Sequence, residues 1–259
     1  MTTATLAAAA FGATPQQWPL PAAHTGHEVW LRAVAAGGQG HYAVALTDLQ
    51  TLARTGTGPL RSLALSTRAS FLRQLGGHDL ARAVDGRAWA LACDSESAAD
   101  ALIGLAADAL GVGRFAASAR LLARATSEVD DSAAPRLGVR LAWVHAELAM
   151  VSGDGTASVG HAQRAVELAT DLGSVRHAVK SDVVCAAALC SAGRYDDSRV
   201  VADRALAAAR EFGLVPLAWA LACLLGDIGS GEFDPPEIAR IRDDAAATVA
   251  RRGGTWASR

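Results

Sequence analysis

The sequence predicts an all-α fold in which about six antiparallel helix pairs stack in series. Three observations lead to this prediction: the composition, a recurring glycine, and columns of small residues around it. Hydrophobic residues make up 51% of the chain but aromatic residues only 5%, and alanine and leucine, which favour helices, dominate the hydrophobic part. The glycine recurs at intervals of 36, 37, 40, 40 and 36 residues, a period typical of repeated helix pairs.

Each recurring glycine marks the predicted turn between the two helices of a pair. Glycine ends a helix in a left-handed conformation at little cost, so it suits this position. In chain order the turns are "GQGHY" with Gly40, "GGHD" with Gly76, "GVGRF" with Gly113, "SGDG" with Gly153, "AGRYDD" with Gly193 and "DIGS" with Gly229. The final helix is expected to begin after Asp234, a good N-cap, and to end before Gly253.

Small residues recur at fixed distances from the turn glycines. Seven positions before each glycine stands an alanine: Ala33, Ala69, Ala106, Ala146, Ala186 and Ala222. Five positions after the first five glycines stand Ala45, Ala81, Ser118, Ser158 and Ser198. Small side chains let two helices approach closely, so these columns predict the contact within each pair. One pair cannot bury its apolar face alone, and neighbouring pairs are therefore expected to stack.

This pattern resembles the tetratricopeptide-repeat superfamily, in its long-period bacterial variety with about 36–40 residues per helix pair. The resemblance implies a right-handed α-solenoid with a concave face formed by the first helix of each pair. One departure stands out, because Asp85 occupies a position in the second helix of the second pair where the family usually has a hydrophobic residue. That helix is either shifted by one residue or belongs to a divergent repeat.

The chain is expected to divide into an N-terminal arm (1–25), a helical repeat domain (26–252) and a C-terminal tail (253–259). The arm is rich in alanine and proline, and Pro15, Pro19 and Pro21 prevent regular helix or strand there, so we expect it to be mobile. Alternatively, the segment "PQQWPLP" folds back into the concave groove.

The resemblance also implies where a groove would lie. The position ten residues before each turn glycine faces the concave side in this family, and neighbouring positions at helical spacing point the same way. The candidate partner-binding residues are Trp30, Ser66, Ser70, Arg73, Ile103, Arg140, Trp143, Glu147, Lys180, Val183 and Trp219. Two interpretations of the tryptophans stay open: they line the groove, or they fill the core between repeats.

Charge and motifs narrow the classes of function. The 24 basic and 26 acidic residues are interspersed and leave a net charge of −2, unlike the basic stripe of a nucleic-acid binder. No phosphate-binding loop, nucleophile elbow or zinc-protease motif is present, and His24 and His27 are too few to form a metal site. We therefore expect no enzyme activity, cofactor or metal.

The location is expected to be cytoplasmic. The N-terminal segment has no basic residue before Arg32, which a secretory signal would need, and no apolar run is long enough to span a membrane. The four cysteines form no C-x-x-C pair and are expected to be reduced.

The leading functional expectation is a scaffold or adaptor that binds a peptide or helix of another protein in the groove. The alternative is a regulatory sensor, related to repeat domains of bacterial transcription regulators, that acts through a partner or a small ligand. Neither nucleic acid nor membrane is expected as a partner, and a homodimer is compatible with both.

Overall fold

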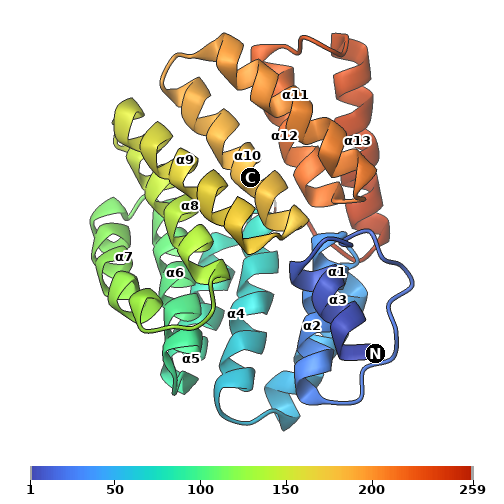
Figure 1. Ribbon diagram of the computed structural model, residues 1–259, viewed down its shortest axis with the longest axis vertical. Helices are drawn as coiled ribbons and strands as arrows, with labels where there is room; N and C mark the ends of the chain where they lie inside the picture. Colours follow the sequence, from blue (N-terminus) through green and yellow to red (C-terminus); the bar gives the residue numbers. More distant parts are fainter. Residues whose placement is uncertain (1, 258–259) are drawn as a thin grey trace.

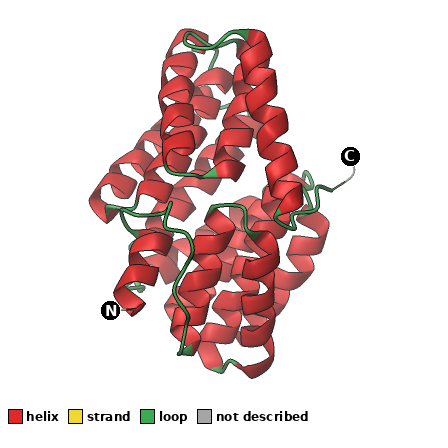
Figure 2. Ribbon diagram, turned by 90° about the vertical axis from the view of Figure 1, so that its right-hand side faces the viewer, coloured by secondary structure: helices red, strands yellow, loops and turns green. Residues whose placement is uncertain are grey.

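The computed structural model describes residues 2–257, and its thirteen regular elements over that range are all helices (Figure 2). Helix α1 (Thr2–Phe11) precedes six consecutive helix pairs. The pairs are α2 (Gly26–Gly38) with α3 (Tyr42–Thr55), α4 (Gly58–Gln74) with α5 (His78–Leu91), α6 (Ser95–Gly111) with α7 (Phe115–Asp130), α8 (Arg136–Val151) with α9 (Gly155–Leu172), α10 (Val175–Ser191) with α11 (Tyr195–Glu211), and α12 (Val215–Ile228) with α13 (Pro235–Arg251).

The pairs are arranged in two layers. The first helices, from α2 to α12, pack against one another in sequence and form an inner layer. The second helices form an outer layer, in which α3, α5, α7, α9 and α11 each pack between two consecutive first helices and α13 packs against α12. In Figure 1 the pairs follow one another around the molecule in sequence order, which is the serial packing that the sequence predicts.

The predicted register is confirmed at the turns and in the small-residue columns. All six turn glycines have a positive φ, between 75° and 88°. The alanines seven positions before them are 0% exposed in every pair, and so are the small residues five positions after the first five glycines. At the fifth pair Ser198 also donates a hydrogen bond to the carbonyl of Ala186 (2.7 Å), so the two columns meet where the helices are closest.

Asp85 identifies the second pair as a divergent repeat rather than a shifted one. Its neighbours in the buried stripe of α5, Ala81 and Ala88, are both fully buried, so the helix keeps the register of the other pairs. Asp85 is itself 0% exposed and forms an ion pair with Arg73 of α4. The buried position therefore holds a charge-bearing group with a partner instead of a hydrophobic side chain.

The series of pairs closes on itself, because the end of α13 reaches the first pair (Figure 1). The amide of Ala43 donates to the carbonyl of Arg252 (2.9 Å), and the Arg252 guanidinium donates to the carbonyl of Gln39 (2.7 Å). Gly253 fits here because its φ is +87° and a Cβ would come within 2.6 Å of the Ala43 Cβ. We call this set of contacts the closing contact.

The predicted tail extends the closing contact to the second pair. The amide of Ala257 donates to the carbonyl of Leu75 (2.8 Å), and Trp256 packs against the apolar cluster of the first pair. The last two residues of the predicted tail, 258 and 259, lie outside the described residues.

The N-terminal segment differs from the mobile arm expected at 1–25. Residues Thr2–Phe11 form helix α1, which packs against α2 and α10 and buries Leu6, Ala9 and Ala10 almost completely. The prolines come only after this helix ends, so they interrupt the chain between α1 and α2 and leave α1 intact.

The proline-containing segment between α1 and α2 lies against the first pair rather than in a groove. The Gln39 side chain donates to the carbonyls of Pro15 (2.7 Å) and Gln17 (3.0 Å). The Trp18 ring stacks on His41 with 3.7 Å between ring centroids. Burial against these groups and the nearby charge of Arg252 lower the pKa of His41 to about 4.

The role of the turn glycines can be tested within one helix pair. We expect Gly153→Ala to lower the free energy of unfolding by about 1 kcal/mol, because Gly153 has φ +76° and alanine is strained there. Gly160→Ala lies in the exposed interior of α9 with nothing within 4 Å of the added Cβ, so it should raise the stability by up to about 1 kcal/mol. Urea unfolding followed by circular dichroism measures both, and equal effects of the two substitutions would contradict the assigned register.

Candidate functional site

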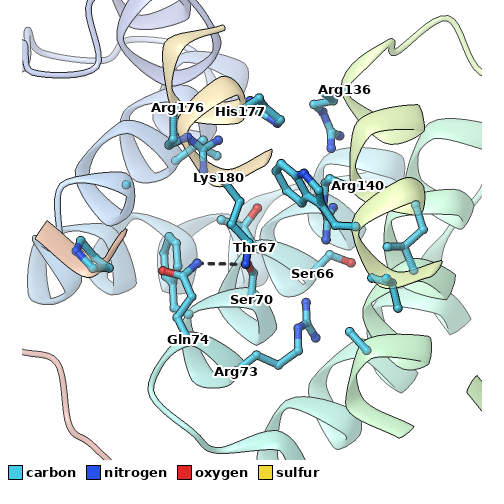
Figure 3. Close-up of a pocket in the computed structure, with 18 of the residues that line it drawn as sticks. Ser66, Thr67, Ser70, Arg73, Gln74, Arg136, Arg140, Arg176, His177 and Lys180 are labelled. Atoms are coloured by element: carbon cyan, nitrogen blue, oxygen red, sulfur yellow. Dashed lines mark hydrogen bonds between the residues drawn. The ribbon is translucent and has the colours of Figure 1, made fainter. Parts of the chain in front are cut away.

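A cavity of about 370 Å³ lies inside the ring of helices. Its walls come from α1, from all six first helices, α2, α4, α6, α8, α10 and α12, and from His78 at the start of α5. The cavity exists because the closing contact brings α12 and α13 back to the first pair, so that the concave face of the series encloses a space. Figure 3 shows polar and charged side chains from α4, α8 and α10 pointing into it.

Ten of the eleven candidate residues line this cavity. They are Trp30, Ser66, Ser70, Arg73, Ile103, Arg140, Trp143, Glu147, Lys180 and Trp219. The exception is Val183, which packs against the apolar cluster that α10 forms with α11, α12 and α13. The cavity-facing stripe of α10 consists of Arg176, His177 and Lys180, and the chain has turned away from the cavity by the next helical turn.

The tryptophans combine the two roles between which the sequence left a choice. Trp30 is only 4% exposed and belongs to the core of the first pair, yet it also lines the cavity. Its Nε1 donates to Thr67 of α4 (3.0 Å), and Nε1 of Trp143 donates to Ser181 of α10 (2.8 Å). Both side chains therefore join successive inner helices and also contribute to the cavity wall.

At one end of the cavity, the positive charge of Arg73 is balanced by buried carboxyl groups. The Arg73 guanidinium contacts Asp85 and lies 3.0 Å from Asp108, and both carboxyl groups are 0% exposed. Burial raises the pKa of Asp85 to about 7, because the loss of hydration and the charge of Asp108 outweigh the attraction of Arg73. One of the two carboxyl groups therefore tends to keep its proton near neutral pH, which leaves one cation facing one anion.

The other end carries three arginines. Arg136 and Arg140 share the buried carboxylate of Asp100, and Arg136 also pairs with Glu96 (2.8 Å). Burial and the charge of Arg73 lower the pKa of Arg140 to about 9. Among the described residues no carboxylate forms an ion pair with Arg176, whose pKa is lowered to about 10 by burial and by the charge of Arg136.

The same arginines also lower the pKa of a neighbouring histidine, His177. His177 is 2% exposed and stacks on Trp143 with 5.5 Å between ring centroids. Burial and the charges of Arg176, Arg136 and Arg140 hold its pKa well below the usual range, so it is neutral at pH 7.

Helix α1 contributes one aromatic residue to the cavity wall. The Phe11 ring lies 5.4 Å from Trp30 and 5.9 Å from His177 between centroids. The guanidinium carbons of Arg136 and Arg176 lie 5.6 Å and 5.7 Å from the same centroid. Phe11 thus sits between the two arginines, whereas none of the residues from 12 to 25 lines the cavity.

Four of the residues that shape this end are not among the candidates predicted from the sequence. Arg136 precedes Arg140 by four residues and Arg176 precedes Lys180 by four, so helical spacing from the named positions would have found both. His177 lies next to Arg176 on the same helix face. Phe11 had no such signal, because it lies in the segment expected to be an arm.

Within residues 2–257 no group of three or more His, Cys, Asp or Glu side chains is arranged to hold a metal ion. Over the same range no helix combines the length and the apolar character needed to cross a membrane. No protein-family model matches the chain, and no curated protein matches its sequence.

The buried carboxyl pair gives the stability a specific pH dependence. The pKa of Asp85 is about 7 in the folded state and 3.8 without its surroundings, so the folded state binds more protons between these values. Stability contributed by this group should therefore fall as the pH rises from about 4 to about 7, by up to about 1.4 kcal/mol per pH unit.

Asp85→Asn should flatten this part of the pH profile, because the amide does not titrate. Urea unfolding at several pH values measures the slope. The control is Asp197→Asn, an exposed residue paired with Arg194, which should leave the slope unchanged. A variant Asp85→Asn that keeps the wild-type slope would show that another group binds the proton.

Proposed function

We propose that this chain is a non-catalytic regulatory sensor, which binds a small organic ligand in the cavity and acts through a partner. The observation that supports this is the closure of the ring, because it encloses the concave face that an open solenoid would present to a protein. A volume of about 370 Å³ lies within the range of small-molecule pockets, roughly 300–1,000 Å³.

The lining of the cavity favours a small molecule over the helix of a partner, which the scaffold expected first would hold in the groove. Aromatic rings such as those of Trp30 and Trp143 share the wall with polar groups such as those of Ser70 and Arg140. Mixed aromatic and polar walls are typical of ligand pockets.

The arrangement of polar groups supports binding rather than chemistry. Ser174 Oγ lies 2.9 Å from Nδ1 of His177, a contact of the kind that nucleophilic catalysis uses. Ser174, however, does not line the cavity, and arginines rather than a carboxylate surround the imidazole. A general base needs an orienting acid, so this pair suits a local helix-start contact.

The position of the cavity also links the binding of a ligand to the closure of the ring. Its walls include Trp30 and Gly38 from α2 and Pro216 and Trp219 from α12, which lie on opposite sides of the closing contact. A ligand that touches both sides stabilises the closed ring over any opened form, and a partner that recognises either form then senses the ligand.

A ligand screen tests this proposal. We expect some compounds of a metabolite library to raise the melting temperature of the protein, and Ser70→Leu to abolish these shifts because its larger side chain fills cavity space. The control is Ser127→Leu, a matched substitution at an exposed position of α7. Native mass spectrometry should confirm one ligand per chain.

The alternative results are equally informative. If no compound binds the wild-type protein but peptides do, and Ser127→Leu rather than Ser70→Leu weakens peptide binding, the function lies on the outer surface and the sensor proposal fails.

A further inference from the structure

We propose that the ligand carries an oxyanion, a carboxylate or a phosphate, which binds between Arg140 and Arg176, and an apolar body that packs against Trp30 and Trp143. This inference rests on the proposed function and specifies the chemical class of the ligand. It depends on the three arginines at one end of the cavity and on how few of their charges are compensated.

Arg176 is the first observation. Its guanidinium lines the cavity, and a guanidinium has five N–H donors. The structure gives it one hydrogen bond, a long one from Nε to the carbonyl of Ala10 (3.4 Å), and no ion pair with a described residue. Arg176 is half-buried and turns a guanidinium without a carboxylate partner toward the cavity, so donors remain for an anion, which points to a ligand that supplies one.

The surrounding charges are the second observation. Arg136, Arg140 and Arg176 form ion pairs with only two carboxylates, Asp100, which two of them share, and Glu96, which is partly exposed. Asp85 also acts on Arg140 through its charge, whereas His177 is neutral and Lys180 lies 3.8 Å from Glu147. Among the described residues Arg176 is thus the arginine at this end without a carboxylate in an ion pair, and one carboxylate or phosphate would supply it.

The pKa shifts at this end of the cavity agree with the unpaired positive charge of Arg176. Burial and a nearby positive charge lower the pKa of each group at this end. The charges are those of Arg73 and Arg176 for Arg140, that of Arg136 for Arg176, and those of all three arginines for His177. Each of these groups would therefore be stabilised by an anion beside it. Guanidinium groups from α8 and α10 point into the same space (Figure 3), and guanidinium is suited to two parallel hydrogen bonds with an oxyanion.

The rest of the cavity defines the other part of the ligand. Trp30, Trp143 and Ile103 form an apolar wall close to the arginines, and Trp143 is held in place by its hydrogen bond to Ser181. An inorganic ion would occupy only a small part of about 370 Å³ and would leave this wall uncovered. The site therefore suits an amphiphilic anion with an aromatic or branched apolar body.

Arg176 also predicts an unusual link between stability and binding. Arg176→Met removes an uncompensated charge, keeps a long side chain against Phe11, and leaves no carboxylate without its partner. We expect the ligand-free variant to be at least as stable as the wild type. Arg120→Met, at an exposed position on the outer helix α7, is the matched control.

Binding is measured by isothermal titration calorimetry with three probes of similar shape. 3-Phenylpropionate carries a carboxylate, phenyl phosphate carries a phosphate, and 3-phenylpropanamide is neutral. We expect one of the two anions to bind at least about tenfold more tightly than the amide, and Arg176→Met to reduce its affinity roughly 10- to 100-fold, as the loss of a charge-assisted hydrogen bond predicts. The tighter anion identifies the carboxylate or the phosphate as the preferred group.

The outcomes separate this inference from the proposed function. If the amide binds as tightly as both anions, or if Arg176→Met binds the anions like the wild type, the anion site is wrong while the sensor proposal stands. If none of the probes binds at millimolar concentration and the library screen also finds no ligand, both are wrong. A marked loss of stability in ligand-free Arg176→Met would assign Arg176 a structural role and would also overturn the inference.

Discussion

The closing contact between α13 and the first helix pair is the constraint on which the rest of this structure depends. In an open solenoid each repeat touches only its neighbours, and the first helices present a continuous concave surface to solvent. Here the backbone of Arg252 and the small residue Gly253 fit directly against α3, so the same surface is enclosed. The cavity, whose wall includes residues of both α2 and α12, depends on that contact.

The charged side chains at the two ends of the cavity are compensated differently. Arg73 meets two buried carboxyl groups from the second and third pairs, which compensate it within the protein. Arg176 lies near Arg136 and the Phe11 ring and has only a weak hydrogen bond. The two ends of the cavity therefore differ, since Arg73 has carboxyl partners and Arg176 has none among the described residues.

Much of the fold was predictable because its signals are local. The turn glycines and the alanine column recur with each pair, and the structure confirms both. Closure was not predictable, because the curvature of the series is the sum of small rotations between pairs that no single motif encodes. Helix α1 was missed for another reason: Pro15 and the prolines after it were allowed to outweigh an alanine-rich run that ends before them.

The candidate site shows the same division between local and long-range information. Register alone placed ten of eleven candidate residues on the cavity, since each lies at a fixed distance from its own turn. Some partners of those residues come from other helix pairs, as in the contact between Arg73 and Asp108. Spacing within one pair does not predict such contacts. The charge pattern that distinguishes the two ends of the cavity therefore became visible only in three dimensions.

The closing contact also has a consequence for the order of folding. It joins Gln39 to Arg252 across 213 positions of the chain, whereas the contacts within and between neighbouring pairs span a few dozen. Contacts between distant segments form late, since the loop between them must be ordered first. During synthesis the first pair emerges long before α13 is complete. The surface of the first pair that contacts α13 therefore stays exposed until the C-terminal residues have been made. The enclosed cavity is in this sense the final product of folding, assembled only when the two ends of the chain meet.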